Sequence, residues 1–398
     1  MDNTVIAIFG NRNAGKSSII NSLTGQQTAI VSDVPGTTTD PVRKRMELPG
    51  LGICTLVDTA GLDDDGGALG AERVRKSRAV AEQADLGVIV FTGEEFPEEA
   101  AQMASLLKGY ETPFVLIHNK SDLGKMPSGL VSRLASEYGS EPLEYSCAEG
   151  APVEVRDSLV AALNAAAKSA AGGERPVFEG LVKAGDLIVL VCPIDSEAPK
   201  GRLILPQVQA IRDILDRNAT AVVLQPSELW AYVTAHGGEI TLVVTDSQVF
   251  PTVNAAVPEE IPLTSFSMLL ARSKGAFGQY REGVKKLDSL QDGDRILMLE
   301  SCAHHATCED IGRVKIPALI RRYSGRQLEF DFVAGLDAIG GDISRYALVV
   351  QCGGCVVTRK QLLNRIRPAV KAGVPVVNYG MAIAWLTGIY RRVMKPLL

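Results

Sequence analysis

Short runs of consecutive apolar residues alternate with longer amphipathic stretches along the first part of the chain. The apolar runs lie at 4–9, 54–59, 86–91 and 113–118, with helix-like stretches such as 97–108 and 151–167 between them. Continuous apolar runs of this length are typical of strands that are buried on both faces of a parallel sheet. The pattern therefore predicts a doubly wound α/β domain that ends near residue 168.

The same alternation continues beyond a predicted linker at 167–176, which is small, polar and glycine-containing. Further apolar runs at 186–194, 220–225 and 240–245, with a helix at 206–217, predict a second α/β block. From Thr264 onward a helical stretch at 265–288 precedes strands at 295–301, 345–351 and 374–380. We therefore expect a larger α/β domain followed by two smaller ones, with the domains at 1–168, 176–263 and 264–398.

Composition narrows the possible partners and compartment. The chain has 398 residues, too many for one compact core, and a net charge of −5. This charge gives no electrostatic reason to expect nucleic acid or an anionic membrane as a partner. The first residues run directly into a strand and we find no long apolar segment, so we expect a cytoplasmic protein without a signal peptide or membrane span. In that reducing compartment the seven cysteines are better read as ligands or core residues than as disulfides.

A phosphate-binding loop follows the first predicted strand. Glycines let backbone N–H groups close around phosphates, while Lys16 can reach the outer phosphates and Ser17 can hold magnesium. The helix that begins there also directs the positive end of its dipole toward the anion. The predicted nucleotide-binding residues of this segment are Gly10, Asn11, Asn13, Ala14, Gly15, Lys16, Ser17 and Ser18.

Three later segments complete a guanine nucleotide site. Asp58 follows a strand and can hold magnesium through water, and the N–H of Gly61 can bind the terminal phosphate. Asp122 can accept two N–H bonds from guanine that adenine cannot supply, which selects GTP. Beside it, Asn119 can fix the base and the loop, and Lys120 can pack along the ring. The last segment comprises Ser146, Cys147 and Ala148, which can offer a backbone N–H to the guanine oxygen.

Over residues 3–168 the chain resembles the tRNA-modification GTPase group. The resemblance implies that 36–40 is the first switch, that Thr38 senses magnesium, and that Asn13 helps to hold an activating potassium ion. With Thr38, the predicted catalytic set is Lys16, Thr38, Asp58 and Gly61, and the magnesium set is Ser17, Thr38 and Asp58. Leu62 stands where a water-orienting glutamine is usual, so we expect slow intrinsic GTP hydrolysis.

Cysteine and histidine are concentrated in the last hundred residues. Cys302 and His304 follow one predicted strand, and Cys352 and Cys355 follow another. Thiolates are soft ligands that bind zinc or iron–sulfur clusters. The glycines between Cys352 and Cys355 leave backbone N–H groups free to turn toward the sulfurs. Spacing alone leaves both metals open, because these four residues would also make a complete zinc site.

Together, the GTPase and cysteine motifs resemble the HydF family of [FeFe]-hydrogenase maturation GTPases over the whole chain. The resemblance implies a [4Fe–4S] cluster held by Cys302, Cys352 and Cys355, with an exchangeable fourth position. The histidine that is frequent in the family just before the Cys352–Cys355 pair is replaced by Gln351 here. His304, Glu309 or Cys308 is then left for the fourth position of the cluster. The family role would be to carry a diiron precursor to apo-[FeFe]-hydrogenase, with two radical-SAM maturases as further partners.

Two other readings remain open at this point. The first is a ribosome- or tRNA-associated GTPase with a C-terminal structural zinc module, and the second is a redox switch in which the cysteine pair forms a disulfide. The middle block carries apolar strands but no recognisable site chemistry. We therefore expect it to drive homodimerisation.

Overall fold

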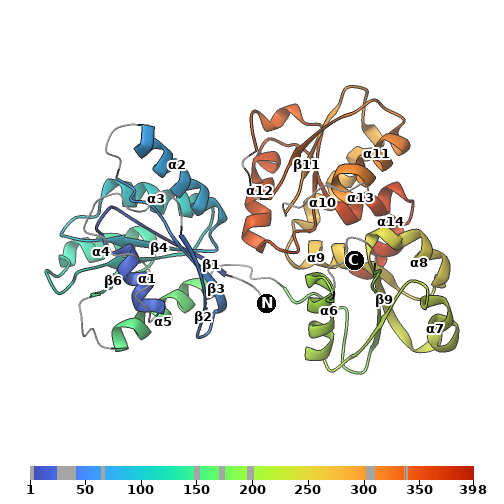
Figure 1. Cartoon of the computed structure of the whole chain (residues 1–398), viewed down its shortest axis with the longest axis horizontal. Coiled ribbons are helices and arrows are strands. Elements are labelled where there is room, and N and C mark those ends of the chain that lie inside the picture. The colour runs from blue at the N-terminus through green and yellow to red at the C-terminus, as the bar shows by residue number, and fades with distance from the viewer. Residues whose placement is uncertain are drawn as a thin grey trace. The chain divides into compact units, whose positions relative to one another are not determined.

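The chain forms two compact units, residues 1–173 and 174–398 (Figure 1). The computed structural model describes residues 4–24, 42–63, 68–147, 153–169, 175–194, 201–301, 310–335, 337 and 339–398. We describe each unit by itself.

The first unit contains a six-stranded sheet in the order β2-β3-β1-β4-β5-β6. All neighbouring strands are parallel except β2, which pairs antiparallel with β3 at one edge. The central strands are apolar and buried on both faces, as the sequence predicts for a parallel sheet. The strands are β1 (Thr4–Gly10), β2 (Val42–Leu48), β3 (Gly52–Asp58), β4 (Leu86–Phe91), β5 (Phe114–His118) and β6 (Leu143–Glu144).

Helices cover both faces of this sheet and create two separate apolar cores. One core includes residues of α3 and α4, such as Leu107 and Leu134, and the other includes residues of α1 and α5, such as Ile19 and Leu163. The helices are α1 (Lys16–Thr24), α2 (Ala68–Gln83), α3 (Glu98–Gly109), α4 (Ser128–Tyr138) and α5 (Val153–Ser169). This arrangement confirms the predicted α/β class, with the phosphate-binding loop between β1 and α1.

The second unit contains two four-stranded parallel sheets, in the orders β10-β9-β7-β8 and β12-β11-β13-β14. The strands of the first are β7 (Leu187–Val191), β8 (Thr220–Leu224), β9 (Ile240–Thr245) and β10 (Leu263–Ser265). The strands of the second are β11 (Arg295–Leu299), β12 (Glu329–Val333), β13 (Leu348–Gln351) and β14 (Val376–Asn378). Both smaller blocks are therefore α/β, as predicted.

One continuous apolar core joins these two sheets and their helices. It extends from Phe178 near the start of the unit to Leu397 at its end. The helices are α6 (Leu205–Asp216), α7 (Leu229–His236), α8 (Phe250–Ala256), α9 (Phe266–Ser273), α10 (Phe277–Gly283), α11 (Ile316–Ser324), α12 (Arg359–Lys371), α13 (Tyr379–Leu386) and α14 (Tyr390–Met394).

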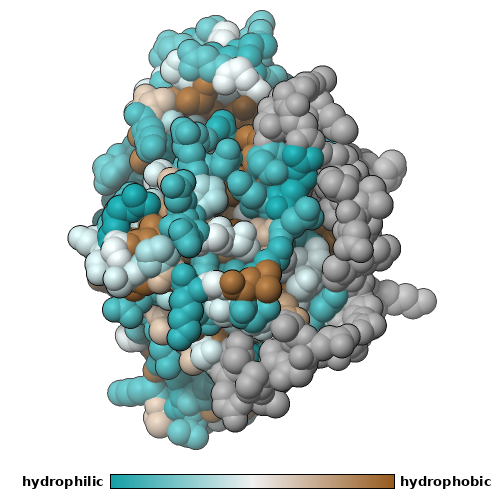
Figure 2. All heavy atoms as spheres, turned by 90° about the vertical axis from the view of Figure 1, so that its left-hand side faces the viewer, coloured by the Kyte–Doolittle hydropathy of each residue, from teal (hydrophilic) through white to brown (hydrophobic). Residues whose placement is uncertain are grey.

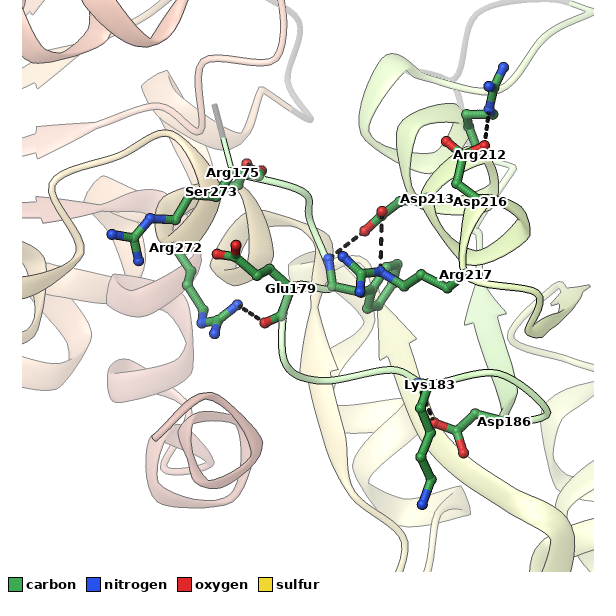
Figure 3. A network of polar contacts seen from close by, with 11 residues as sticks. Arg175, Glu179, Lys183, Asp186, Arg212, Asp213, Asp216, Arg217, Arg272 and Ser273 are labelled. Atoms are coloured by element: carbon green, nitrogen blue, oxygen red, sulfur yellow. Dashed lines mark hydrogen bonds and ion pairs between the residues drawn. The ribbon is translucent and has the colours of Figure 1, made fainter. Parts of the chain in front are cut away.

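A polar network fixes the entry segment of the second unit (Figure 3). Arg175 forms a backbone pair with Ser273 at the end of α9, and the Ser273 hydroxyl donates to the Arg175 carbonyl at 2.5 Å. Nearby, the Phe178 N–H donates to the Asp213 carboxylate of α6 at 2.6 Å, and Arg217 pairs with the same carboxylate at 3.2 Å. These bonds attach the chain that arrives from the first unit to two different helices.

The structure adds details that the sequence pattern missed. The pattern of apolar runs did not include the edge strands β2 and β12. Arg43 and Arg45 lie exposed on β2. The stretch 265–288 is helical in three pieces, α9, α10 and a 3₁₀ turn (Val284–Ser289), rather than one. The predicted linker begins later than expected, because α5 continues to Ser169.

The described surface of the first unit that faces the viewer in Figure 2 is mainly hydrophilic, with apolar side chains in small patches. Among the helices that the structure describes, none combines the length and apolar character needed to cross a bilayer.

Candidate functional site

The loop between β1 and α1 has the tight backbone that phosphate binding requires. Gly10 and Gly15 have positive φ angles of 151° and 94°. A Cβ on Gly10 would lie 2.2 Å from the Val90 carbonyl oxygen, and one on Gly15 would lie 2.1 Å from the Asn119 side-chain nitrogen. Asn13 also adopts a positive φ, 59°. Glycine is therefore needed at both positions for the loop to pack against β4 and the segment after β5.

Lys16 lies folded into this loop. Its Nζ donates to the carbonyl oxygens of Gly10 and Asn11, both at 2.9 Å, and the side chain is buried. Burial lowers the pKa of Lys16, while the negative charges of Asp58 and Asp63 oppose that shift. An arriving phosphate would supply further negative charge, so this lysine is suited to binding an anion.

Ser17 and Asp58 meet beside Lys16. The Ser17 hydroxyl donates to Asp58 Oδ2 at 2.7 Å, while the buried Asp58 Oδ1 has no hydrogen-bond partner within the described ranges. Burial raises the pKa of Asp58, and the bond from Ser17 and the charge of Lys16 oppose it. A hydroxyl and a carboxylate with an unused oxygen form a donor set suited to magnesium, a hard cation that prefers oxygen ligands. Thr38, the third predicted magnesium residue, lies outside the described residues.

The segment after β3 packs directly on the phosphate-binding loop. Thr59 bonds to the Ile8 carbonyl through its hydroxyl at 2.7 Å, and the Leu62 N–H donates to the Gly10 carbonyl at 3.2 Å. A Cβ on Gly61 would lie 2.5 Å from Arg12 Cγ. Gly61 is therefore close to the loop, and Leu62 next to it is buried.

An ion pair that the motif analysis missed joins these two segments. Asp63 accepts the backbone N–H of Arg12 at 2.6 Å and its Nε–H at 2.9 Å. Partial burial raises the pKa of Asp63, but the Arg12 bonds outweigh it and hold this pKa below its usual range. Neither Arg12 nor Asp63 belongs to the predicted nucleotide-binding residues. The pair could have been suggested only by expecting the phosphate-binding loop and the segment after β3 to lie close together.

The predicted guanine-binding segments also converge. Asn119 donates from its side chain to the Ala14 carbonyl at 2.8 Å, and its buried Oδ1 has no partner within the described part of the chain. The Ser146 hydroxyl donates to Asp122 Oδ1 at 2.6 Å, so the two segments that would contact the base are joined. Lys120 has a positive φ of 61° and is exposed.

The remaining residues of the last guanine-binding segment, and the histidine that precedes Asn119, complete this part of the site. Cys147 is partly buried, and burial raises the pKa of its thiol to about 11. His118 contacts the Gly93 carbonyl at 3.0 Å and is buried, as expected for a packing residue. Ala148 lies outside the described residues.

The second candidate site lies where the strands of the C-terminal sheet end together. Leu299 of β11 pairs with Gln351 of β13, which pairs with Asn378 of β14, and Leu299 also pairs with Val333 of β12. Cys352 follows Gln351 directly, and its N–H donates to the Leu299 carbonyl at 2.8 Å. Ligands bind at this carboxyl edge in open α/β sheets.

Cys352 and Cys355 come together in one turn. Gly354 between them has a φ of 69°, and a Cβ there would lie 2.4 Å from Leu362 Cδ1. Burial raises the pKa of the Cys355 thiol, as does the neighbouring Cys352, while the charge of Lys274 lowers it. In the ranges that the structure describes, no group of three metal-binding side chains is present. The predicted partners of this cysteine pair lie outside those ranges: Cys302, His304, Cys308 and Glu309.

Gln351 has a core role. Its side chain is fully buried, accepts a hydrogen bond from the Tyr280 hydroxyl at 2.6 Å and donates to the Leu362 carbonyl at 3.2 Å. Both ends of this amide are therefore occupied by bonds within the core.

Different family models match the two units of the chain. The family model described as "Hydrogen maturase F dimerization domain" matches residues 177–275, and that described as "Hydrogen maturase F tetramerization domain" matches 278–396. The model described as "50S ribosome-binding GTPase" matches residues 5–120. Together the two maturase models cover more than half of the chain.

Individual relatives match the first unit. The tRNA modification GTPase MnmE of Nitratidesulfovibrio vulgaris (strain DP4) is 37% identical over 175 residues, which is 44% of this chain and 36% of that protein. MnmE of Methylorubrum populi is 38% identical over 170 residues, which is 42% of this chain and 33% of that protein. The chain thus spans about a third of the length of these relatives. A solved structure of Aquifex aeolicus Era bound to GDP and AlF4⁻ aligns at 21% identity with a TM-score of 0.37, covering 56% of this chain and 93% of that one.

Proposed function

The chain belongs to the HydF family and is a GTP-hydrolysing enzyme of hydrogenase maturation, and we propose that it carries an iron–sulfur cluster and a diiron cargo. In this proposal Cys302, Cys352 and Cys355 hold a [4Fe–4S] cluster whose fourth position exchanges. The protein would receive a diiron precursor from the two radical-SAM maturases and deliver it to apo-[FeFe]-hydrogenase. The nucleotide site would time this exchange in the cytoplasm.

We assign the steps of GTP hydrolysis to residues of the first unit. Lys16 would leave its two loop carbonyls and bind the outer phosphates, while the Gly61 N–H binds the terminal phosphate. Ser17, Asp58 and Thr38 would hold magnesium, which when bound neutralises charge that develops between the β- and γ-phosphates. Asp122, held by Ser146, would select guanine together with Asn119.

The rate of GTP hydrolysis would be low because the usual glutamine is absent at position 62. Leu62 is apolar and buried, so it cannot orient the attacking water as glutamine does in other GTPases. We infer slow intrinsic hydrolysis, and we assign to Asn13 a potassium ion that compensates part of the missing charge stabilisation. A slow GTPase suits a timing switch, because the GTP-bound state then persists long enough for a partner to bind or leave.

One observation carries the cluster proposal: the Cys352 N–H bonds to Leu299, at the end of the strand that leads into Cys302. Ser301 is the last described residue of that segment and is buried. The cysteine pair and the strand that precedes the third cysteine therefore share one sheet edge. His304, Glu309 or Cys308 would occupy the fourth iron position.

Transfer of cargo to apo-hydrogenase tests this role. Protein isolated under anoxia from cells that contain both radical-SAM maturases should activate purified apo-[FeFe]-hydrogenase, measured as hydrogen evolution. Cys352→Ala should abolish activation because it removes a cluster ligand, whereas Cys192→Ala, a buried cysteine that follows β7, should not. Lys16→Ala should slow the release of bound partners when GTP is present.

The same experiment distinguishes the carrier role from the alternative of a ribosome- or tRNA-associated GTPase with a zinc module. If the wild-type protein contains zinc in place of iron and fails to activate apo-hydrogenase, the ribosome- or tRNA-associated alternative is favoured. If Lys16→Ala leaves partner release unchanged with GTP present, the timing role is wrong although the carrier role survives.

A further inference from the structure

We propose that Arg365 and Tyr379 form an anion-recognition site beside Cys352 that donates hydrogen bonds to the sulfur atoms of the cluster. The ligand class is an anionic metal–sulfide cluster, and the two residues position it and balance its charge. This inference rests on the proposed function, because it requires that the cysteine pair binds a cluster.

Arg365 reaches the sheet edge from α12. Its guanidinium donates to the Val333 carbonyl at 2.7 Å and also to the Glu300 carbonyl. Leu299, the residue before Glu300, accepts the Cys352 N–H. The guanidinium and Cys352 are therefore attached to consecutive peptide units at the end of β11.

Among the described residues, no carboxylate forms an ion pair with Arg365. The side chain is only 7% exposed and its Nε has no acceptor within the described ranges, while the charges of Asp337 and Glu300 act on it from beyond ion-pair distance. The nearby Glu300 carboxylate is taken by Arg313, which donates to it at 2.8 to 3.2 Å. Burial of a cation that has no close ion pair and keeps an unsatisfied N–H is unfavourable. An anion at the cysteine pair would supply both the missing charge and the missing acceptor.

Tyr379 adds a second donor at the same level of the sheet. It is the first residue of α13 and follows Asn378, which pairs with Gln351, so Tyr379 and Cys352 directly follow the paired ends of adjacent strands. Its hydroxyl is buried without a partner in the described part of the chain and lies over Gly312, where a Cβ would be 2.4 Å from it. Burial raises the pKa of Tyr379 well above its usual value, so the group remains a neutral O–H donor.

The two groups share a preference for the same ligand. A guanidinium N–H can only donate, and a neutral phenol donates readily, so the complementary ligand must accept. Cluster sulfides and cysteine thiolates are acceptors with negative charge. Hydrogen bonds to these sulfurs and nearby positive charge stabilise the reduced cluster, which carries one more negative charge than the oxidised one.

The test uses the full chain purified under anoxia with its cluster. Redox titration followed by electron paramagnetic resonance gives the midpoint potential and the g values of the reduced cluster. Arg365→Gln and Tyr379→Phe should each shift the midpoint to a more negative potential and alter the g values. Arg365→Lys, which keeps the charge, should shift it less than Arg365→Gln. Arg322→Gln, an equal charge change at an exposed position of α11, is the matched control and should leave the potential unchanged.

Wild-type potential and g values in both Arg365→Gln and Tyr379→Phe would overturn the inference. If Arg365→Gln does not fold, Tyr379→Phe decides alone, since it removes one oxygen that has no hydrogen bond to any described residue of the protein. Absence of iron from the wild-type protein is a separate result, because it would contradict the proposed function rather than this assignment.

Discussion

Two glycines in the phosphate-binding loop determine the backbone shape of the nucleotide site. Gly10 and Gly15 both have positive φ angles and lie against neighbouring segments. Lys16 and Ser17 follow this loop directly, so its backbone sets how their side chains meet Asp58 at the end of β3. The chemistry of the site therefore depends as much on residues without side chains as on charged ones.

Gly15→Ala should weaken GTP binding by about tenfold or more. The added Cβ would meet the Asn119 side-chain nitrogen at 2.1 Å and would force alanine into a φ of 94°. Titration with a fluorescent GTP analogue measures the effect. Gly124→Ala is the matched control, because a Cβ added there would have no heavy atom within 4 Å. Equal affinity for the GTP analogue in the two variants would contradict the packing argument.

Cysteine reactivity gives a second prediction at this scale. Burial raises the pKa values of Cys54 and Cys147 to about 11 and that of Cys192 to about 12. At pH 8 only about one thiol in a thousand or fewer would then be a thiolate, the reactive form. Iodoacetamide should label these three residues slowly in the folded protein and faster as pH rises toward 11. Mass spectrometry of native and denatured samples measures this, and equal labelling rates at pH 8 would contradict it.

At the scale of elements, strands made of continuous apolar runs were predictable, whereas the charged edge strands β2 and β12 were not. β4 is a continuous apolar run and follows directly from the pattern. β12 alternates charged and apolar residues and β2 contains three consecutive basic residues, so neither edge strand has that signal. Gly275 lies in the break between α9 and α10, where a Cβ would lie 2.8 Å from the Ala271 carbonyl. Such packing distances cannot be read from a sequence.

The candidate sites divide in the same way. Motif residues such as Lys16 and Cys352 could be named from local sequence, because loop and spacing signals are short-range. Arg12–Asp63 and the Arg365 contacts could not, because they join segments that only the folded sheets bring together.

The bond between Tyr280 and Gln351 connects α10 to the strand before the cysteine pair. Tyr280→Phe should lower the free energy of unfolding by about 1 to 3 kcal/mol, because it leaves the Gln351 amide oxygen buried without a donor. Urea denaturation measures the loss. Tyr323→Phe removes an exposed hydroxyl bonded to Asp288 and should change stability by less than about 0.5 kcal/mol. Equal losses in the free energy of unfolding of the two variants would show that the buried bond contributes no more to stability than the exposed one.

At the scale of the whole molecule, the family's dimerization and tetramerization domains indicate that the chain self-associates. We expect a homodimer through the middle sheet, where β8 is an edge strand with Val223 exposed. Unpaired edge strands readily pair with another chain.

Val223→Lys should therefore weaken the dimer by about tenfold or more. Light scattering at micromolar concentration measures the fraction of monomer. Val42→Lys, an exposed valine on the edge strand of the first unit, is the control and should leave the dimer intact. A wild-type protein that is monomeric under these conditions would contradict the dimer.

The presence of the cluster can be measured by iron and sulfide analysis of anaerobically purified protein, combined with Mössbauer spectroscopy. We expect about four iron and four sulfide per chain with a [4Fe–4S] spectrum. Cys302→Ala, Cys352→Ala and Cys355→Ala should each lose the cluster while Cys192→Ala keeps it. A full cluster in all three of the first variants, or zinc without iron in the wild-type protein, would contradict the cluster assignment.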